Sequence, residues 1–392
     1  MLYRSFGRTG EKVSILGFGC MRLPIIGGRH QDIDEPLATE MLRYALDQGV
    51  NYVDTAYPYH SAAFDGTPGA SEAFVGQVLA GGYRDKVLLA TKLPGWLVKS
   101  RKDMDRILAG QLERLQTERI DCYLLHGVDG PEFTRLSGLG ALRFLDDAMA
   151  KGKIRYAGFS FHDQAAAFAP IVDAYDWDFC QIQYNYMDVE YQAGAAGLAY
   201  AADRGLGVVV MEPLKGGRLA GPMPASIQAL WDGSPARRRP VGWALRFVWD
   251  DSRVNVVLSG MSTMEQVREN VALGSEGRAA SLSTAELAAI GRVQEAYRAR
   301  TIVDCTGCGY CLPCPQGLDI PRLFSFLNDA ALFDNLAEEC RAYTIAVGAG
   351  QTAPASACSE CGQCVEACPQ QLDVTRELAG VARTFAEEEP ES

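Results

Sequence analysis

The sequence predicts an α/β protein in which a parallel (β/α)8 barrel, or TIM barrel, is followed by a small domain made mostly of helices and loops. Eight short apolar runs alternate with helical patterns over the first 285 of 392 residues. A barrel of this kind needs roughly 250 residues. Nine of the twelve cysteines lie after position 304, so the composition changes where the barrel pattern stops. We therefore assign residues 1–285 to the barrel and residues 286–392 to a second domain.

The eight predicted strands are apolar runs that end in small or polar residues, as buried parallel strands do. They are Ser14–Gly19, Asn51–Asp54, Val87–Thr91, Ile120–Leu125, Tyr156–Ser160, Phe179–Gln183, Gly207–Val210 and Asn255–Leu258. Gly17 and Gly19 resemble the start of a Gly-x-Gly-x-x-Gly motif, but Arg22-Leu23-Pro24 follows instead of a helix. An open dinucleotide-binding sheet is therefore rejected. The leading segment Tyr3–Val13 is predicted to form a hairpin that closes the bottom of the barrel.

Helices are predicted from apolar periodicity and from capping residues. Thr39–Gln48 has one apolar face and stops at Gly49. Three other helix starts are expected at pairs in which a serine precedes a carboxylate by three residues. These pairs are Ser100 with Asp103, Ser262 with Glu265, and Ser283 with Glu286. In the second domain, Arg322–Leu336 is predicted as a helical spacer and residues 387–392 as a solvated acidic tail.

Composition limits the classes of partner. The net charge is −12, with 48% apolar and 22% charged residues, as in a soluble globular enzyme. An acidic chain repels nucleic acid and anionic membranes, and the basic run at residues 237–239 is interpreted as a solvated loop. No apolar stretch reaches the roughly 18 residues of a membrane helix, and the first residues lack a signal peptide core. We expect a soluble, cytoplasmic protein with no nucleic-acid or membrane partner.

Four side chains capable of acid–base chemistry follow consecutive predicted strands. Asp54 and Tyr59 follow the second strand, Lys92 the third and His126 the fourth. Taken singly, the pair Asp54 and Tyr59 is more consistent with a turn and packing, and His126 with a structural role. Lys92 is as consistent with a surface charge as with catalysis. The carboxyl ends of barrel strands meet at one mouth, where barrel enzymes carry out their chemistry. We therefore expect these four side chains to converge.

This set resembles the aldo/keto reductase family over about residues 1–285. The most specific pieces are Asp54-Thr55-Ala56-x-x-Tyr59, Thr91-Lys92 and Leu125-His126. The resemblance implies that the chain interconverts a small-molecule carbonyl and an alcohol with NADP(H) or NAD(H). Hydride addition to a carbonyl forms an alkoxide, which needs a proton donor and a positive field. Tyr59 is the predicted acid, with its pKa lowered by Lys92, which Asp54 keeps charged. His126 hydrogen-bonds the substrate oxygen or assists proton delivery.

The resemblance also implies which residues contact the cofactor. They follow the later strands and are Ser160, Gln181, Leu214, Gly260, Ser262, Gln266 and Asn270. The chain departs from the family at Phe161-His162, where relatives have asparagine, and at Met211, where they have an aromatic residue. Gly260 and Gln266 replace cations that contact a 2′-phosphate in many relatives, so a preference for NADPH is not implied. The segment Gly216–Pro224 and Trp231 are expected to shape the substrate site.

The cysteines after position 304 form two groups with metal-binding spacing. The second group, Cys358-x₂-Cys361-x₂-Cys364-x₃-Cys368-Pro369, has the spacing of a ferredoxin-type 4Fe-4S site. A four-thiolate zinc site normally uses two separated Cys-x₂-Cys pairs, so iron–sulfur is the favoured interpretation. The first group, Cys305-x₂-Cys308-x₂-Cys311-x₂-Cys314-Pro315, is one residue shorter in its last interval. It predicts a second cluster, with zinc or an empty site as alternatives.

If the arrangement resembles a two-cluster bacterial ferredoxin, the ligand sets cross between the groups. One set is then Cys305, Cys308, Cys311 and Cys368, and the other is Cys358, Cys361, Cys364 and Cys314. Cys340 lies between the groups and is interpreted as a buried helical thiol.

The sequence thus predicts an NAD(P)H-linked oxidoreductase whose clusters exchange electrons with a redox partner protein. Hydride carries two electrons, whereas a 4Fe-4S cluster usually passes one, and no flavin site is evident, so sensory or structural clusters remain open. The alternative is an iron–sulfur electron-transfer or docking protein on a catalytically weak barrel.

Overall fold

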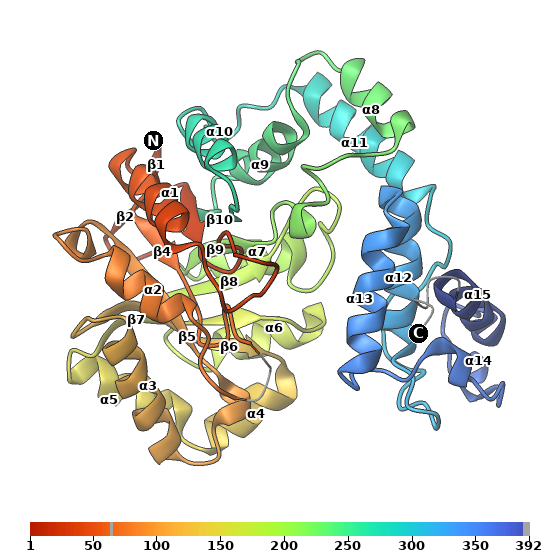
Figure 1. The fold of residues 1–392 in the computed structure, drawn as a ribbon, viewed down its shortest axis with the longest axis horizontal. Helices are drawn as coiled ribbons and strands as arrows, with labels where there is room; N and C mark the ends of the chain where they lie inside the picture. Colours follow the sequence, from red (N-terminus) through yellow and green to blue (C-terminus); the bar gives the residue numbers. More distant parts are fainter. Residues whose placement is uncertain (63–65, 387–392) are drawn as a thin grey trace. The chain divides into compact units, whose positions relative to one another are not determined.

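Eight parallel strands close into a barrel in the computed structural model, which describes residues 1–62 and 66–386. The strands follow one another around the barrel in chain order, and the last pairs with the first (Figure 1). They are β3 (Leu16–Gly19), β4 (Tyr52–Asp54), β5 (Leu88–Leu93), β6 (Ile120–Val128), β7 (Ile154–Phe161), β8 (Phe179–Gln183), β9 (Gly207–Met211) and β10 (Val256–Gly260). The predicted barrel is confirmed.

The chain divides into two compact units. Unit 1 comprises Met1–Leu219 and Arg239–Leu282 and contains the barrel. Unit 2 comprises Ala220–Arg238 and the chain from Ser283 onward. The sequence did not indicate that residues 220–238 belong with the second unit. The division into residues 1–285 and 286–392 remains a proposal from the sequence.

Strand register brings the predicted site residues to the same end of the barrel. Asp54 on β4 pairs with Gly19 on β3 and with Ala90 on β5, two residues before Lys92. Lys92 in turn pairs with Leu124, two residues before His126 on β6. The register shifts between Leu125 and Val128, so the ladder is irregular where His126 lies. Because the strands are parallel, these residues lie at the carboxyl ends of their strands.

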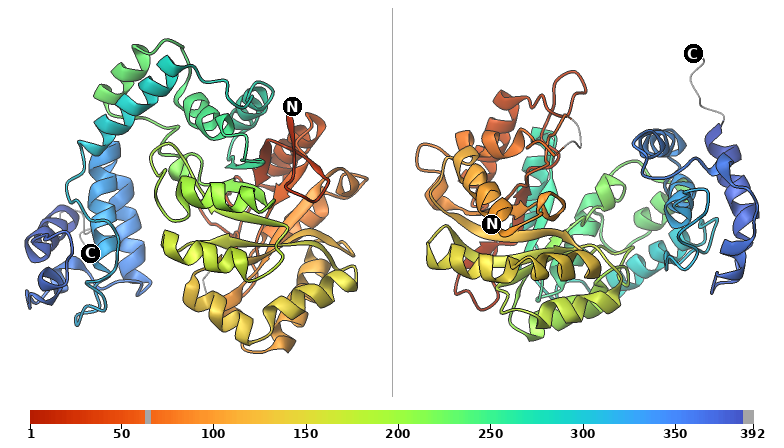
Figure 2. Two further views of the ribbon diagram at one scale, coloured as in Figure 1. Left: turned by 180° about the vertical axis from the view of Figure 1, so that it is seen from behind. Right: turned by 90° about the horizontal axis from the view of Figure 1, so that it is seen from below.

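Helices cover the outside of the barrel (Figure 2). Those of unit 1 are α1 (Glu35–Asp47), α2 (Ser71–Val78), α3 (Arg101–Arg114), α4 (Gly130–Gly138), α5 (Ala141–Ala150), α6 (Ala165–Asp173), α7 (Gly194–Asp203), α9 (Pro240–Asp250) and α10 (Met264–Gly274). Contacts with the strands of the barrel are made by α3, α5, α7, α9 and α10, as expected of helices with an apolar face. No helix in the described ranges combines the length and the apolar character needed to cross a bilayer.

The helix starts differ in part from those predicted. Helix α1 begins before Thr39, because Asp34 accepts from the backbone N–H of Leu37. Ser100 precedes α3, but its hydroxyl bonds the Asp103 carboxylate instead of capping the backbone. The prediction for α10 is wrong by one residue, since Thr263 rather than Ser262 caps it. The capping box of Ser283 is confirmed.

A short hairpin closes the bottom of the barrel, as predicted. It consists of β1 (Tyr3–Ser5) and β2 (Lys12–Ser14), which pair antiparallel. Phe6 follows β1 and is fully buried against Tyr52 and Phe179, with ring centroids 5.9 and 5.4 Å away. A Cβ at Gly207 would lie 2.4 Å from the Phe6 ring, so only glycine fits there.

Unit 2 has its own apolar core. Its helices are α8 (Ala225–Asp232), α11 (Thr284–Arg298), α12 (Ile320–Phe333), α13 (Leu336–Gly348), α14 (Gln363–Glu366) and α15 (Val374–Ala386). Helix α12 packs against α13 and α15, and most of the clustered cysteines pack against the same core.

The predicted helical spacer at residues 322–336 is wrong as a single helix. Asp334 adopts a left-handed conformation, with a φ of 50°, and breaks it into α12 and α13. Cys340 is buried on α13, in agreement with its interpretation as a buried helical thiol. The predicted acidic tail at residues 387–392 lies outside the described residues.

Candidate functional site

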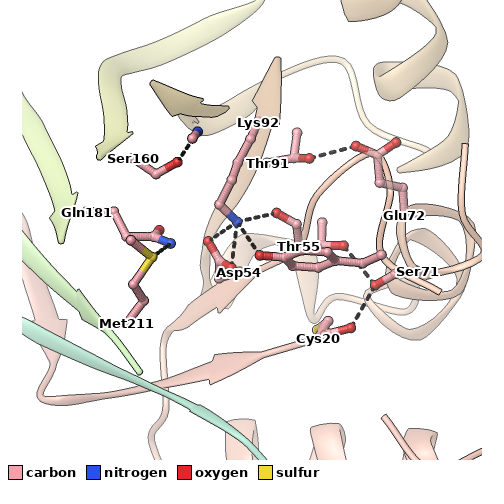
Figure 3. Close-up of polar contacts among 12 residues, drawn as sticks. Cys20, Asp54, Thr55, Ser71, Glu72, Thr91, Lys92, Ser160, Gln181 and Met211 are labelled. Atoms are coloured by element: carbon pink, nitrogen blue, oxygen red, sulfur yellow. Dashed lines mark hydrogen bonds and ion pairs between the residues drawn. The ribbon is translucent and has the colours of Figure 1, made fainter. Parts of the chain in front are cut away.

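Lys92 is the hydrogen-bond centre of the site at the carboxyl ends of the strands (Figure 3). Its Nζ donates to Oδ1 and Oδ2 of Asp54, at 2.7 and 2.9 Å, and to the carbonyl oxygen of Thr55, at 2.8 Å. The same nitrogen lies 3.2 Å from the hydroxyl oxygen of Tyr59. Three of the four residues predicted at strand ends therefore meet at one ammonium group.

Lys92 and Asp54 form a buried ion pair. Their exposed fractions are 0% and 2%, and a charge buried to this degree is tolerated only when it is paired and hydrogen-bonded. Burial by itself lowers the pKa of Lys92, but the charge of Asp54 and the hydrogen bonds to Asp54 and Tyr59 raise it above its usual value. Burial raises the pKa of Asp54 while Lys92 opposes that rise. Because both oxygens of Asp54 accept from the ammonium, we describe the group as a carboxylate.

Tyr59 keeps its proton at neutral pH. Burial raises the pKa of Tyr59 by more than the neighbouring Lys92 ammonium lowers it. The prediction of a lowered phenol pKa is therefore wrong in its net direction, although Lys92 acts in the predicted sense. The hydroxyl retains its proton and faces a positive charge.

His126 is a neutral imidazole beside Tyr59. The ring centroids of His126 and Tyr59 are 6.2 Å apart in an edge-on arrangement. The His126 ring also contacts Trp96, with ring centroids 5.3 Å apart. Burial, then the positive charge of Lys92 and that of His162, holds the pKa of His126 well below its usual range. Its Nδ1 is buried and has no hydrogen-bond partner among the described residues. The four predicted residues are thus brought together, with His126 in contact through its ring.

A cavity of about 420 Å³ opens at this end of the barrel, within the size range of small-molecule sites. Asp54, Tyr59 and His126 line it, whereas Lys92 lies behind them and touches the cavity only through its partners. Of the predicted cofactor residues, four line the same cavity. They are Ser160, Gln181, Leu214 and Gly260.

Ser160 and Gln181 extend from neighbouring strands at the cavity wall. Ser160 Oγ accepts from the backbone N–H of Gly127 at 2.7 Å, and Gln181 Nε2 lies 3.4 Å from the sulfur of Met211. The other amide atom, Gln181 Oε1, is buried and unpaired in the described part of the chain. A buried unpaired amide oxygen is costly, so a ligand with an N–H donor would satisfy this site.

The remaining three predicted cofactor residues lie next to Gly260 but do not line the cavity. Ser262 Oγ donates to the carbonyl of Arg22 at 2.7 Å, and the Ser262 N–H donates to Gln266 Oε1 at 2.8 Å. Asn270 Nδ2 donates to Ser259 Oγ at 2.8 Å. These side chains shape the loop after β10, and their role toward a cofactor remains a prediction.

Residues that the sequence did not single out also line the cavity. Met21 and Arg22 follow β3, and Lys215 follows β9. A Cβ at Gly260 would lie 3.2 Å from the Arg22 side chain, and one at Gly216 would lie 3.4 Å from its Nη2. The rule that strand ends converge, applied to β3, is the signal that would have found Arg22.

The segment Gly216–Pro224 reaches the cavity in part, through Gly216, Gly217 and Arg218. Trp231 does not line the cavity. It is buried on α8 in unit 2, so the expectation that it shapes the substrate site is wrong.

The clustered cysteines of unit 2 gather in two sets. Cys305, Cys308, Cys311 and Cys368 line one small cavity together with Ile320 and Phe324. The neighbours of Cys364 are Cys358, Cys361 and Cys314, whose charges add to the burial that raises the pKa of Cys364. In the described ranges, no three His, Cys, Asp or Glu side chains are placed to hold a single metal ion. A four-iron cube keeps its thiolate ligands farther apart than a single ion does. Both sets therefore suit the crossed pairing, which remains a prediction.

Comparisons with known proteins identify both parts of the chain. The profile of the "Aldo/keto reductase family" matches residues 15–294, and that of a "4Fe-4S dicluster domain" matches residues 304–372. The chain is 31% identical over 245 residues to the 6-dehydroglucose reductase of Novosphingobium aromaticivorans, covering 60% of this chain and 76% of that protein. It is 28% identical over 352 residues to protein tas of Escherichia coli, covering 76% and 99%.

Solved structures are similar over the same region. The aldo-keto reductase AKR11C1 of Bacillus halodurans in its holo form superposes with a TM-score of 0.61 at 26% sequence identity. The match covers 75% of this chain and 96% of that structure.

The buried His126 predicts that stability falls at acidic pH. The pKa of His126 is lowered in the folded state. Its contribution to the free energy of unfolding is therefore complete above the usual pKa of about 6.5, and it is lost as pH falls toward the pKa of the folded state. The loss approaches about 1.4 kcal/mol per pH unit. Urea unfolding at about pH 7.5 and about pH 5.5 should give a smaller pH dependence for His126→Asn than for the unsubstituted protein. Equal pH dependence in the two proteins would contradict this assignment.

Proposed function

Because this chain belongs to the aldo/keto reductase family, we propose that its barrel interconverts a carbonyl and an alcohol with a nicotinamide cofactor. The observation that carries the proposal is the contact of one buried ammonium, that of Lys92, with both Asp54 and Tyr59. Tyr59 and His126 line one cavity, so both can reach the oxygen of a bound substrate.

The proton needed for reduction comes from Tyr59. Hydride addition leaves negative charge on the carbonyl oxygen, and the Tyr59 hydroxyl donates its proton to that oxygen. The phenolate that remains lies 3.2 Å from Lys92 Nζ, whose positive charge stabilises it. Asp54 keeps Lys92 charged and fixes its direction. In the oxidation of an alcohol the same groups act in reverse.

His126 orients the substrate. A neutral imidazole carries one N–H donor and one acceptor nitrogen. Beside Tyr59, the donor nitrogen can hydrogen-bond the substrate oxygen and place it at the hydroxyl. Holding the reacting atoms in this way accounts for a large share of enzymatic rate enhancement.

The residues present suit a nicotinamide, which supplies or accepts the hydride when bound. Gln181 and Ser160 would hold its carboxamide, and the unpaired Gln181 Oε1 supports this assignment because the carboxamide NH₂ can donate to it. Leu214 and Gly260 line the same cavity, while Ser262, Gln266 and Asn270 would lie toward the adenosine end. Without cations at 260 and 266, both NADP(H) and NAD(H) are candidates.

Substitution of Tyr59 by phenylalanine tests the proton donor. Tyr59→Phe removes only the hydroxyl, so turnover of a probe aldehyde such as 4-nitrobenzaldehyde should fall by about 10²-fold or more. The dissociation constants of NADPH and NADH, measured by fluorescence titration, should stay within about twofold. Unchanged turnover would reject Tyr59 as the acid.

For unit 2 we propose two 4Fe-4S clusters with crossed ligands. Cys305, Cys308, Cys311 and Cys368 would hold one cluster, and Cys358, Cys361, Cys364 and Cys314 the other. The apolar lining of the first cavity, which includes Ile320 and Phe324, limits solvent access to a cluster there. With crossed ligands, each cluster is bound by cysteines of both groups, so the two cysteine groups are linked through the metal.

Iron and sulfide analysis of anaerobically prepared protein tests the cluster number. Two clusters require about eight irons and eight sulfides per chain, with EPR signals of interacting reduced clusters. Four irons would reduce the proposal to one cluster, and zinc in place of iron would reject it for the site concerned.

We propose that the clusters pass electrons to or from a partner protein with a basic surface. Residues 301–392 contain four arginines, no lysine and fourteen carboxylate side chains, so most of the net charge of −12 lies in this part of the chain. Such a charge favours encounter with a positively charged surface at low ionic strength.

A second candidate function is an electron-transfer or docking protein on a catalytically weak barrel. His162 and Met211, where family contacts to the nicotinamide are altered, favour it. Titration with NADH and NADPH, followed by absorbance of the clusters, separates the two candidates. Nucleotide binding with aldehyde turnover is expected if the barrel is an enzyme. Absence of both, with clusters reducible by dithionite, would favour the second candidate.

A further inference from the structure

The first turn of α2 is buried and polar. Ser71 and Glu72 are its first two residues, and both are 0% exposed. Neither is used as a helix cap, since the residue before the helix, Ala70, makes no side-chain capping bond. Burying a hydroxyl and a carboxylate is costly unless both are fully partnered. The hydrogen-bond partners of Ser71 and Glu72 therefore show which segments these two side chains hold in place.

Ser71 connects three of the segments that form the site. Its Oγ lies 2.8 Å from Thr55 Oγ1 and donates to the carbonyl of Cys20, at the end of β3, at 3.1 Å. Its backbone N–H donates to the carbonyl of Tyr59 at 3.2 Å. Figure 3 shows the Ser71 hydroxyl between Thr55, which follows Asp54 directly, and Cys20. Ser71 therefore contacts the neighbours of Asp54, and its N–H contacts the backbone of Tyr59.

Glu72 connects α2 to β5, the strand that carries Lys92. Its Oε1 accepts from Thr91 Oγ1 at 2.6 Å and from Gln111 Nε2 at 2.8 Å. Its Oε2 accepts from Nε and Nη2 of Arg114 at 2.9 and 2.6 Å. Both carboxylate oxygens of Glu72 therefore accept hydrogen bonds, and one of the donors, Thr91, is the residue next to Lys92.

Gln111 extends this network to the Lys92 backbone and to the next strand. Its Nε2 also donates to the carbonyl of Lys92 at 3.0 Å, and its Oε1 accepts from Tyr123 on β6 at 2.7 Å. Tyr123 precedes His126 by three residues. The network that starts at Glu72 thus reaches the strands of both Lys92 and His126.

From this convergence we propose that Ser71 and Glu72 are positioning residues, which set the distance between Lys92 and Tyr59 without touching the reactants. The proposal rests on the proposed reductase function of the barrel. The turn with Tyr59 and the strand with Lys92 come from different parts of the chain, and α2 is bonded to both. A small displacement of a proton donor from its charged neighbour reduces catalysis far more than it reduces binding.

Two substitutions test this role. Glu72→Gln replaces one carboxylate oxygen by an NH₂ donor, so either Arg114 or the pair Thr91 and Gln111 loses its acceptor. Thr91→Val removes the hydroxyl that donates to Glu72 and lies 3.4 Å from Gln111 Nε2, while keeping the shape of the side chain. For both we expect kcat for 4-nitrobenzaldehyde to fall by about 10- to 100-fold. The KM of the aldehyde and the dissociation constant of the nicotinamide should stay within about twofold, and the pH profile of kcat should shift because Tyr59 and Lys92 no longer keep their spacing.

Glu286→Gln is the matched control. Glu286 is also a buried glutamate, 7% exposed and paired with Arg238, but it lies in unit 2. Its substitution should lower stability yet leave kcat and its pH profile unchanged. If Glu72→Gln and Thr91→Val behave like this control, the positioning role is overturned. Should Glu72→Gln fail to fold, the milder Thr91→Val decides the question.

A crystal structure of Thr91→Val separates this inference from the proposed function. We expect the distance between Lys92 Nζ and Tyr59 Oη to depart from 3.2 Å by about 0.5 Å or more. This result stands even if the unsubstituted protein reduces no carbonyl, an outcome that would count against the reductase proposal alone. An unchanged distance overturns the positioning role.

Discussion

Lys92 and Asp54 carry opposite charges inside the barrel wall, and the arrangement of the site follows from how that pair is accommodated. An ammonium group offers three protons, and here four oxygen atoms surround it: two from Asp54, the carbonyl of Thr55 and the hydroxyl of Tyr59. Leaving either charge unpaired at this depth costs about 3–5 kcal/mol. The pair therefore fixes the end of β4, the end of β5 and the turn that carries Tyr59 relative to one another.

Burial acts on the ionisable groups around this pair in different directions. It raises the pKa of Tyr59 and lowers that of His126, because in each case it disfavours the charged form. Lys92 keeps its charge because Asp54, and then Tyr59, outweigh the effect of burial on its pKa. The site thus combines a protonated phenol, a neutral imidazole and one fixed positive charge, a combination that suits the proposed donation of a proton to a developing alkoxide.

Unit 2 adds chemistry of a different electron count. Hydride transfer moves two electrons together, whereas a 4Fe-4S cluster usually passes one. The two proposed clusters could therefore carry, between them, the two electrons of one hydride. The acidic composition of residues 301–392 and the two sets of converging cysteines support the proposal of electron exchange with another protein. The family match at residues 304–372 supports the cluster domain independently of the barrel.

The sequence by itself determined the barrel, the four residues at its strand ends and the two cysteine groups, because each of these depends on local order along the chain. Alternating strands and helices predict a barrel, strand ends such as Lys92 and His126 converge in any barrel, and cysteines two or three residues apart can share one cluster. Other features depended on contacts between distant segments. The bond from Ser262 to the Arg22 carbonyl, with Thr263 instead capping α10, is of this kind. So are the placement of Arg22 over Gly260 and the bonds from Ser71 and Glu72 to the site. The net rise of the Tyr59 pKa was also decided only by tertiary structure, because it depends on how deeply packing buries the phenol, and no local pattern encodes that burial.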